Sequence, residues 1–248
     1  MANFIGIAGD YQKEKAINRR LNAALVVFMS ICGIFFFLGF IAAKSSIWWF
    51  LLAVAVLVPT YKLVERFMDK QIRIARTEED GADGEKEIIP YLKQLPDTFT
   101  VVCDLDFADS YGNIDHLIIG PTGIFSIDVK NWKGTVIADG KGELLVNGRP
   151  TDKRHIRNFT ARTMDLRSRL DALTKLDPFI QCVFVFPHTH LQAKWGSTGY
   201  VHCIHADQLV DYITQGKAGK PITPANLPRF ISAAKALKET VSKSQETK

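Results

Sequence analysis

An apolar run of twenty uncharged residues, 24–43, dominates the first part of the sequence. A helix rises 1.5 Å per residue, so a run of this length spans the roughly 30 Å hydrocarbon core of a membrane. After Lys44 a second apolar run covers 47–58 and continues to residue 61. It is short, but its ends carry aromatic side chains that prefer membrane interfaces, namely Trp48, Trp49 and Tyr61. We therefore predict two transmembrane helices within residues 21–61.

Two other structures could produce the same apolar pattern. The first run could be a signal peptide, but it is longer than the apolar part of such a peptide and a second run follows at once. The two runs could also form a helical hairpin buried in a soluble core. Core helices, however, rarely carry apolar residues on all sides for five turns.

Basic residues flank the two runs unequally, which predicts an orientation. Lys and Arg cluster before the first run and after the second, and only Lys44 lies between the runs. The positive-inside rule then places a polar lead, residues 1–20, and everything after the second helix in the cytoplasm. The chain is thus predicted to be a multi-pass protein of the inner (cytoplasmic) membrane. Its four cysteines, with no C-x-x-C pair, agree with a reducing compartment.

The remaining sequence predicts a mixed domain over 81–240, reached through a linker helix over 62–80 that Gly81-Ala82-Asp83-Gly84 should end. A helix is expected over 85–95, although Pro90 is an awkward interior residue. Further helices are expected over 155–173 and 225–237, and a disordered tail over 241–248. β-Branched and aromatic residues predict strands at 98–107, 114–119, 124–129, 144–146, 181–186 and 200–204. Helices mixed with strands indicate an α/β fold, or an α+β mixed sheet flanked by helices, preceded by a transmembrane helical hairpin.

Charge changes this picture little. The formal net charge is +5, but residues 81–248 carry twenty-one Lys and Arg against nineteen Asp and Glu. A nearly neutral domain gives no general indication of nucleic-acid binding, so only local clusters of charge can.

Asp128-Val129-Lys130 is the most informative group of residues for chemistry. Residues two apart on a strand point to the same face, so Asp128 and Lys130 should project together. If Pro121 and Thr122 form the centre of a symmetric hairpin loop, Asp115 lies directly opposite Asp128, with Cβ atoms roughly 4.5–5.5 Å apart. Two carboxylates this close repel each other unless a cation or proton lies between them. We therefore predict a Mg²⁺ or Mn²⁺ site at Asp115 and Asp128, with Lys130 beside it.

An Asp-x-Lys pair on a strand can also be an ordinary surface ion pair. The facing Asp115 is what favours the functional interpretation, because it adds a second like charge to an apolar pattern. On charge alone, Asp128→Asn should relieve repulsion and leave the metal-free protein equally or more stable.

Five short motifs resemble, in order and spacing, the nuclease-related domain (NERD) family over about residues 81–190. They are Gly81-Ala82-Asp83-Gly84-Glu85, Leu92-x-x-Leu95-Pro96, Asn113-Ile114-Asp115-His116-Leu117, Gly120-Pro121-x-Gly123-Ile124-Phe125 and Asp128-Val129-Lys130-Asn131-Trp132-x-Gly134. The resemblance implies a restriction-endonuclease-like core of the PD-(D/E)xK superfamily, with Mg²⁺ or Mn²⁺ as cofactor.

The resemblance also implies roles for four residues. Glu85 is implied as a helix glutamate, Asp115 as the first metal-binding acid, Asp128 as the second acid, and Lys130 as the lysine of the motif. Many relatives have Glu where this chain has Asp128, one methylene shorter, and the later helix lacks the glutamine that relatives often carry. Without the family, Glu85 reads as an acid that complements a helix dipole, and Glu87 could take its place.

The predicted helix over 155–173 has a basic side. Ile156, Phe159, Leu166, Leu170 and Leu173 form an apolar stripe, and four arginines lie roughly opposite it: Arg154, Arg157, Arg162 and Arg169. Such a face could neutralise the phosphates of a nucleic acid. It could equally be a solvated surface, or contact lipid headgroups.

Histidines also cluster late in the chain, at 188, 190, 202 and 205, with Cys203 among them. Alternation along a strand places Cys203 and His205 on one face and His202 on the other, which disfavours zinc.

These observations support two hypotheses of different classes. The first is a membrane-anchored, metal-dependent nuclease on the cytoplasmic face that hydrolyses phosphodiesters, with DNA favoured over RNA. The second is a catalytically weak module that binds nucleic acid or protein at the membrane.

Overall fold

The computed structural model describes residues 1–42, 47–106, 112–193, 199–216 and 219–246. It divides into two compact units, and each is described by itself. The helical unit comprises 11–80, and the domain unit comprises 1–10 together with 81–248.

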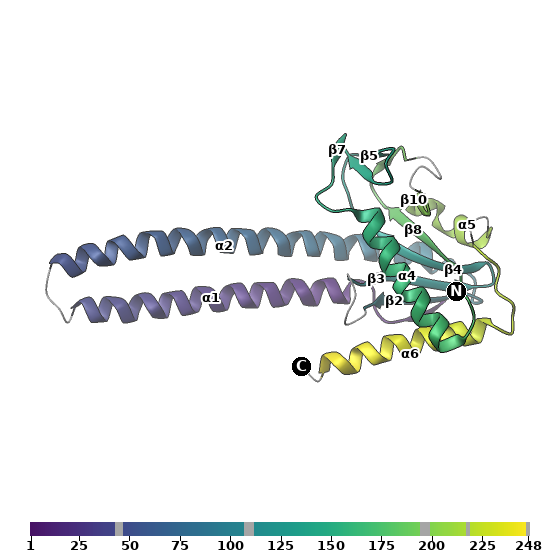
Figure 1. The fold of residues 1–248 in the computed structure, drawn as a ribbon, viewed down its shortest axis with the longest axis horizontal. Helices are drawn as coiled ribbons and strands as arrows, with labels where there is room; N and C mark the ends of the chain where they lie inside the picture. Colours follow the sequence, from purple (N-terminus) through teal and green to yellow (C-terminus); the bar gives the residue numbers. More distant parts are fainter. Residues whose placement is uncertain (43–46, 107–111, 194–198, 217–218, 247–248) are drawn as a thin grey trace. The chain divides into compact units, whose positions relative to one another are not determined.

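The helical unit consists of two long antiparallel helices, α1 (Asp10–Ala42) and α2 (Ile47–Glu87) (Figure 1). Arg20 on α1 and Glu79 on α2 form an ion pair of 2.7 Å. The predicted break at Gly81–Gly84 is wrong, since α2 continues through both glycines and ends at Glu87. A helix tolerates isolated glycines at a cost of about 1 kcal/mol each.

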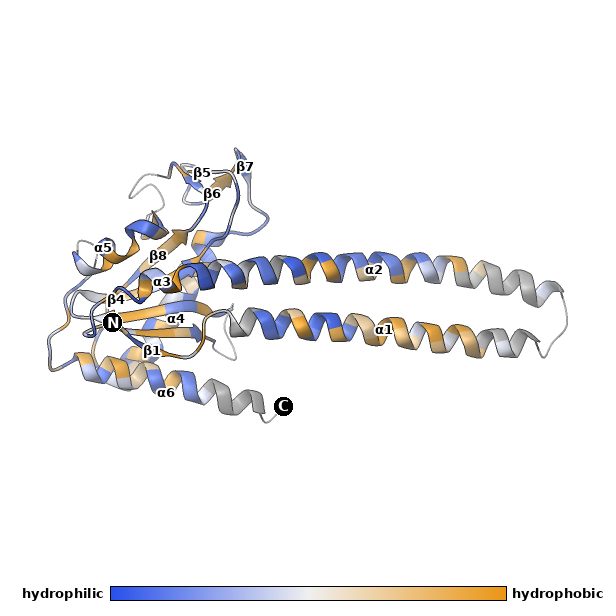
Figure 2. Ribbon diagram, turned by 180° about the vertical axis from the view of Figure 1, so that it is seen from behind, coloured by the Kyte–Doolittle hydropathy of each residue, from blue (hydrophilic) through white to orange (hydrophobic). Residues whose placement is uncertain are grey.

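The described part of the first apolar run, 24–42, is helical, and most of its described side chains are exposed. Among the described residues one helical stretch, Lys13–Phe36, is long and apolar enough to cross a membrane, and only 6% of it is buried. Figure 2 shows the hydrophobic part of α1. The second apolar run belongs to α2, but most of its side chains lie outside the described residues. The second predicted span is therefore not confirmed.

The domain unit is built on a six-stranded sheet with the order β1-β2-β3-β4-β8-β10. β3 is antiparallel to its neighbours β2 and β4. β1 pairs with β2 in parallel, and β8 pairs in parallel with both β4 and β10. The strands are β1 (Asn3–Ile5), β2 (Thr100–Leu105), β3 (Ile114–Gly120), β4 (Gly123–Val129), β8 (Ile180–Phe186) and β10 (Val201–His205). All of these except β1 were predicted, with ends shifted by one or two residues.

β1 was not predicted, because three residues before a long helix give no strand pattern. The expected polar lead instead contributes its first residues to the sheet edge, with Asn3 opposite Thr100 and Ile5 opposite Val102. Ala2 and Ala8 are buried. The first ten residues are therefore part of the domain rather than a separate segment.

A second, four-stranded sheet has the order β7-β6-β5-β9. Only β6 was predicted as a strand, since the others are short and mostly half-exposed. The members are β5 (Thr135–Ala138), β6 (Leu144–Val146), β7 (Arg149–Pro150) and β9 (His190–Leu191).

Helices cover both faces of the main sheet, so the fold is the mixed α/β arrangement that the sequence predicted. Pro90 explains why the helix expected over 85–95 is divided, because α3 begins beside it. α6 extends through 246, into the segment expected to be a disordered tail. The helices are α3 (Ile89–Leu92), α4 (His155–Thr174), a 3₁₀ turn (Ala206–Gln208), α5 (Leu209–Thr214) and α6 (Leu227–Glu246).

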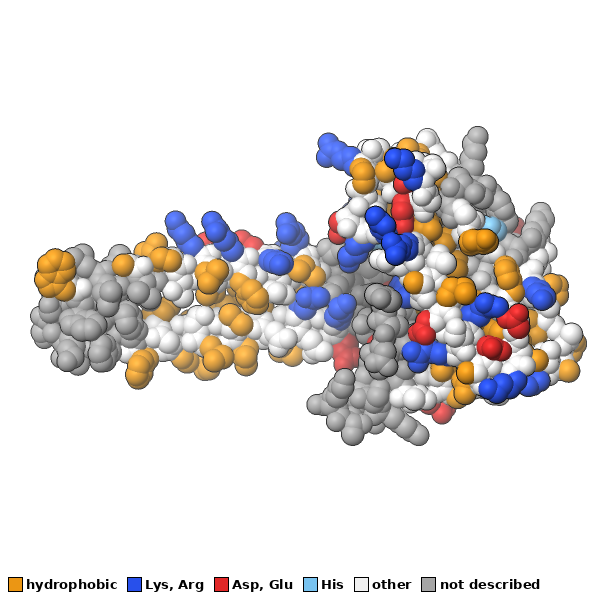
Figure 3. Space-filling view, viewed as in Figure 1, with side chains coloured by type: hydrophobic (Ala, Val, Ile, Leu, Met, Phe, Trp, Pro, Cys, Tyr) orange, Lys and Arg blue, Asp and Glu red, His pale blue; other side chains and the backbone are white. Residues whose placement is uncertain are grey.

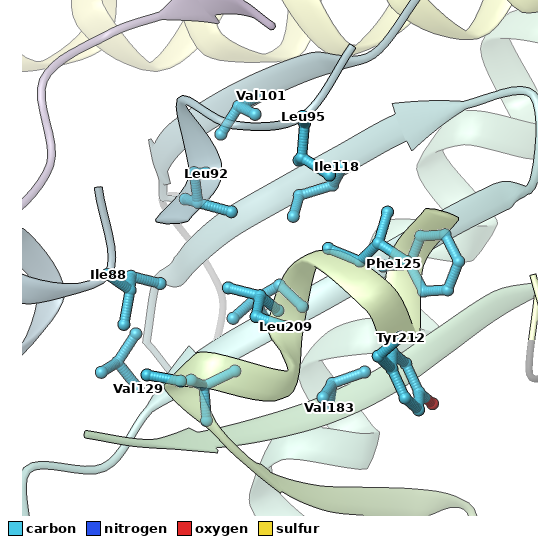
Figure 4. Packing of buried hydrophobic residues seen from close by; sticks show 14 of the residues in the cluster. Ile88, Leu92, Leu95, Val101, Ile118, Phe125, Val129, Val183, Leu209 and Tyr212 are labelled. Atoms are coloured by element: carbon cyan, nitrogen blue, oxygen red, sulfur yellow. The ribbon is translucent and has the colours of Figure 1, made fainter. Parts of the chain in front are cut away.

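Two apolar clusters fix these layers. On one face, Leu92 of α3 and Leu209 of α5 pack over Ile118 and Phe125 of the sheet (Figure 4). On the other face, Leu166 of α4 and Phe230 of α6 pack over the alternate side chains of the same strands. A sheet buried on both faces explains why β3, β4 and β8 are apolar throughout.

Candidate active site

Two buried aspartates, Asp115 and Asp128, lie on β3 and β4, the two central strands of the main sheet. Gly120 pairs with Gly123 and His116 with Ile127, which is the predicted hairpin register. Continued by one residue beyond the printed strand pairs, this register places Asp115 opposite Asp128. The Val129 backbone N–H donates to Asp115 Oδ2 at 2.7 Å, so the Asp115 carboxylate lies beside β4. Asp115 and Asp128 are 6% and 2% exposed.

A third aspartate, Asp104, lies in β2 next to this pair. Its neighbours Cys103 and Leu105 pair with His116 and Ile114, which brings Asp104 level with Asp115. Its backbone has φ +49°, and its carboxylate accepts a hydrogen bond from Asn113 Nδ2 at 3.2 Å. The sequence analysis missed Asp104. The available signal was a lone acid inside an otherwise apolar strand.

Glu85 reaches the site from the last turns of α2. It is buried, and the backbone N–H of Gly9 donates to its carboxylate. Gly84 allows this approach, because a Cβ there would lie 2.6 Å from Cβ of Asn131, one residue after Lys130. The glycine before the glutamate therefore lets α2 pack against the end of β4. Its neighbour Glu87 instead contacts His188 at the surface, with Oε2 2.5 Å from Nε2, so Glu87 does not replace Glu85.

Substituting Gly84 should test this close contact against a matched glycine. Alanine normally stabilises a helix by about 1 kcal/mol relative to glycine, and a Cβ at Gly81 on the same helix meets nothing within 4 Å. Gly81→Ala should therefore raise the free energy of unfolding by about that amount. Gly84→Ala should lower it by about 1–3 kcal/mol, because the new Cβ overlaps Asn131. Chemical denaturation of the two purified variants measures both signs; equal stabilisation would contradict the contact.

The acids of the site differ in how easily they ionise. The pKa of Glu85 is raised to about 10. Burial is the largest cause, and the negative charges of Asp115, Asp104 and Asp128 add to it. Burial and Asp128 raise the pKa of Asp115 to about 7. Burial also acts to raise the pKa of Asp128, but Lys130 and Arg162 outweigh it and the pKa is lowered. Near neutral pH, Asp128 is thus the firmly charged acid.

Two cations hold that charge. Lys130 Nζ forms an ion pair with Asp128 Oδ1, and Arg162 Nη2 one of 2.6 Å with Asp128 Oδ2. Lys130 also lies 5.1 Å from the centre of the Phe184 ring, on the neighbouring strand. Asp128 and Lys130 therefore share a face, as predicted.

The four predicted nucleic-acid-binding arginines do not form one surface. Arg154 and Arg157 are exposed on the first turn of α4, as expected. Arg162 is largely buried at Asp128, so its place on the exposed basic face was wrong; Arg169 pairs with Asp165 at 3.0 Å. Leu173, assigned to the apolar stripe, is 54% exposed, because the buried side of α4 continues from Leu170 to Thr174. Lys and Arg side chains are visible near β7 and the start of α4 (Figure 3).

Two histidines near the site were not singled out from the sequence. The His155 ring lies edge-on to Trp132, with ring centres 4.8 Å apart, and burial lowers its pKa to about 4. His116 is fully buried and burial likewise lowers its pKa to about 4. Of the histidines weighed for zinc, His202 instead contacts the Tyr212 hydroxyl through Nδ1 at 2.5 Å.

The residues present suit a hard divalent cation by donor type. Asp115 and Asp128 offer carboxylate oxygens from adjacent strands, and Glu85 Oε2 is buried with no hydrogen-bond partner among the described residues. A buried oxygen of this kind favours a cation or a proton. However, no three His, Cys, Asp or Glu side chains in the described part of the chain converge on one point as a ready metal site.

Comparisons with known proteins show what the segment that carries these residues is similar to. An uncharacterized protein of Bacillus anthracis is 28% identical over 102 residues, which is 40% of this chain and 44% of the relative. The chain thus spans less than half of that relative's length. No solved structure matches. Residues 80–187, a segment that contains Glu85, Asp115, Asp128 and Lys130, match the family model of the nuclease-related domain.

Proposed function

We propose that this chain is a membrane-anchored, metal-dependent nuclease that hydrolyses phosphodiester bonds, in DNA rather than RNA, on the cytoplasmic face. The observation that carries the proposal is the buried pair Asp115 and Asp128, with Lys130 on the same strand face, inside the nuclease-related domain. The mixed sheet between helices is compatible with a restriction-endonuclease-like core of the PD-(D/E)xK type.

Each residue has a role that follows from its contacts. Asp115 and Asp128 would hold Mg²⁺ or Mn²⁺. Glu85 Oε2 would be a further oxygen ligand, since Glu85 is near enough for both aspartates to raise its pKa. When bound, such an ion supplies positive charge that stabilises a phosphodiester under attack and makes water more acidic. Lys130, 15% exposed, carries its ammonium where it can bind a phosphate oxygen or position the attacking water.

The proposed membrane hairpin is supported by the two chain segments that together form the domain unit. Residues 1–10 and 81–248 belong to one unit, and β1 pairs with β2 inside it. Both segments must then lie on the same side of any membrane, so the chain between them crosses it an even number of times. If α1 crosses, α2 crosses back. The basic residues Arg66, Lys70 and Arg73 on α2 favour the cytoplasmic side.

A cleavage assay tests the proposed chemistry directly. The purified full-length chain should cut linear duplex DNA in the presence of Mg²⁺ or Mn²⁺ and lose that activity when a chelator is added. The same ions should raise its melting temperature, because they bind only the folded site. If DNA is bound but not cut under any of these conditions, the catalytically weak binding module is the correct function. The two cations already on Asp128 are the observation that favours this second candidate.

Nucleic-acid binding should depend on the exposed arginines at the start of α4. Arg154→Ala with Arg157→Ala should weaken duplex DNA binding similarly for all sequences and reduce the salt slope of log K by about 2, since two phosphate contacts are lost. Lys93→Ala with Lys235→Ala removes two exposed charges elsewhere and should leave the slope unchanged. An unaltered slope in the arginine variant would assign those side chains to solvent or to lipid headgroups.

A further inference from the structure

Arg162 on α4 points inward and contacts the buried carboxylate of Asp128 rather than solvent. Its guanidinium is held at two points: Nη2 on Asp128 Oδ2 and Nη1 on the Asn113 carbonyl oxygen, each at 2.6 Å. The group lies 5.5 Å from the centre of the Phe159 ring, one turn earlier on α4. With its side chain 12% exposed, Arg162 is fixed in place beside the two facing aspartates.

Each carboxylate oxygen of Asp128 therefore already has a positively charged partner. Lys130 takes Oδ1 and Arg162 takes Oδ2, while the carboxylate itself is 3% exposed. A divalent cation sharing this carboxylate would lie close to the guanidinium, and like charges at that range in a buried site repel strongly.

The second contact of Arg162 makes an exchange of partners physically reasonable. If Nη2 leaves Asp128, Nη1 can remain on the Asn113 carbonyl, so the guanidinium stays at the edge of the site. A guanidinium presents several N–H groups in a planar fork that matches the oxygens of a phosphate. A phosphodiester at the site would therefore offer Arg162 a new anionic partner as Asp128 becomes available.

We propose that Arg162 is a positioning residue that competes with the divalent cation for Asp128 and is drawn away by a substrate phosphate. This rests on the proposed function. In the absence of nucleic acid, Arg162 keeps Asp128 neutralised and metal affinity low. Nucleic acid removes Arg162 from Asp128 and raises metal affinity. By linkage, the cation raises the affinity for nucleic acid by the same factor.

The test compares metal binding, not cleavage, in wild type and Arg162→Gln. Titration calorimetry with Mn²⁺ and no DNA should show about tenfold tighter binding to Arg162→Gln, the size typical of a coupling between two sites. Titration with Ca²⁺, another ion that carboxylates bind, is then repeated with and without short duplex DNA. DNA should tighten Ca²⁺ binding to wild type and should have no such effect on Arg162→Gln.

Arg167→Gln is the matched control, because Arg167 on the same helix also pairs with an aspartate, Asp177, and donates to the carbonyl oxygen of Pro178. Its metal affinity should equal that of wild type. Should Arg162→Gln lose its fold, Arg162→Lys keeps the charge and should bind Mn²⁺ as weakly as wild type while losing the DNA effect. Equal or weaker Mn²⁺ affinity in Arg162→Gln, or an intact DNA effect in either variant, overturns the competition. No metal binding to wild type or variant overturns the proposed function and the competition with it.

Discussion

Asp115→Asn and Asp128→Asn should both reduce metal-dependent cleavage by orders of magnitude, yet they should change the stability of the metal-free protein in opposite directions. Each substitution removes a carboxylate charge that a divalent cation would need. The two aspartates face each other across one strand pair, but their surroundings differ. The free energy of unfolding therefore distinguishes the two variants, whereas cleavage activity does not.

Asp115→Asn should stabilise the metal-free protein by about 1–2 kcal/mol above neutral pH. Burial and the facing Asp128 raise the pKa of Asp115 to about 7, which means that its charged form is less favourable in the folded chain than in the unfolded one. Asparagine removes that charge. Its Oδ1 can still accept the hydrogen bond from the Val129 backbone N–H.

Asp128→Asn should destabilise the metal-free protein by about 3 kcal/mol, since breaking a buried ion pair leaves its partner uncompensated. Here two partners, Lys130 and Arg162, lose their counter-charge, and both are mostly buried. Sequence reasoning predicted the opposite sign, because it included the repulsion from Asp115 but not the attraction of Arg162. The lowered pKa of Asp128 shows that attraction prevails.

Thermal and chemical denaturation in the presence of chelator measure both changes. Asp177→Asn is the control: it breaks an exposed pair with Arg167, which is worth little, and should change stability by under about 1 kcal/mol. Added Mg²⁺ should raise the melting temperature of wild type more than that of either site variant. A shift of the same sign in both site variants would contradict the proposed arrangement of charges.

The register of the hairpin at 114–129 was predictable from the sequence because a short glycine-flanked turn fixes which residues face each other. The same register places Asp115 opposite Asp128. β4 and β8 were equally predictable from their apolar runs, since strands buried on both faces carry few polar residues.

Arg162 shows what the sequence could not supply. Helical spacing alone assigns a residue to a face, but a long side chain at the edge of that face can turn inward to reach a charge. Asp104 was missed because a single acid in a strand has no pattern, and its role depends on the neighbouring strand. β1 was missed because its three residues form a strand only against an edge that lies about a hundred positions later in the chain.

The pairing of β1 with β2 makes the membrane topology open to a decisive test. A reporter enzyme active only outside the cytoplasm should give no signal when fused after residue 248, and none when fused before residue 1. The same reporter placed between the two helices, within 43–46, should give a strong signal, because that segment joins the proposed spans. A cytoplasm-specific reporter should show the reverse pattern.

Each alternative leaves its own result. If all three fusions are silent, neither helix crosses the membrane and the apolar surface of α1 must be covered in another way. If only the fusion at 248 is active, the chain crosses once, and β1 could not then reach β2 across the bilayer. The predicted outcome, in which both ends agree and the middle differs, is the one compatible with residues 1–10 and 81–248 forming a single unit. Gly9, just before α1, donates its backbone N–H to Glu85 in the last turns of α2. The predicted topology keeps both residues on the side where intracellular nucleic acid is found.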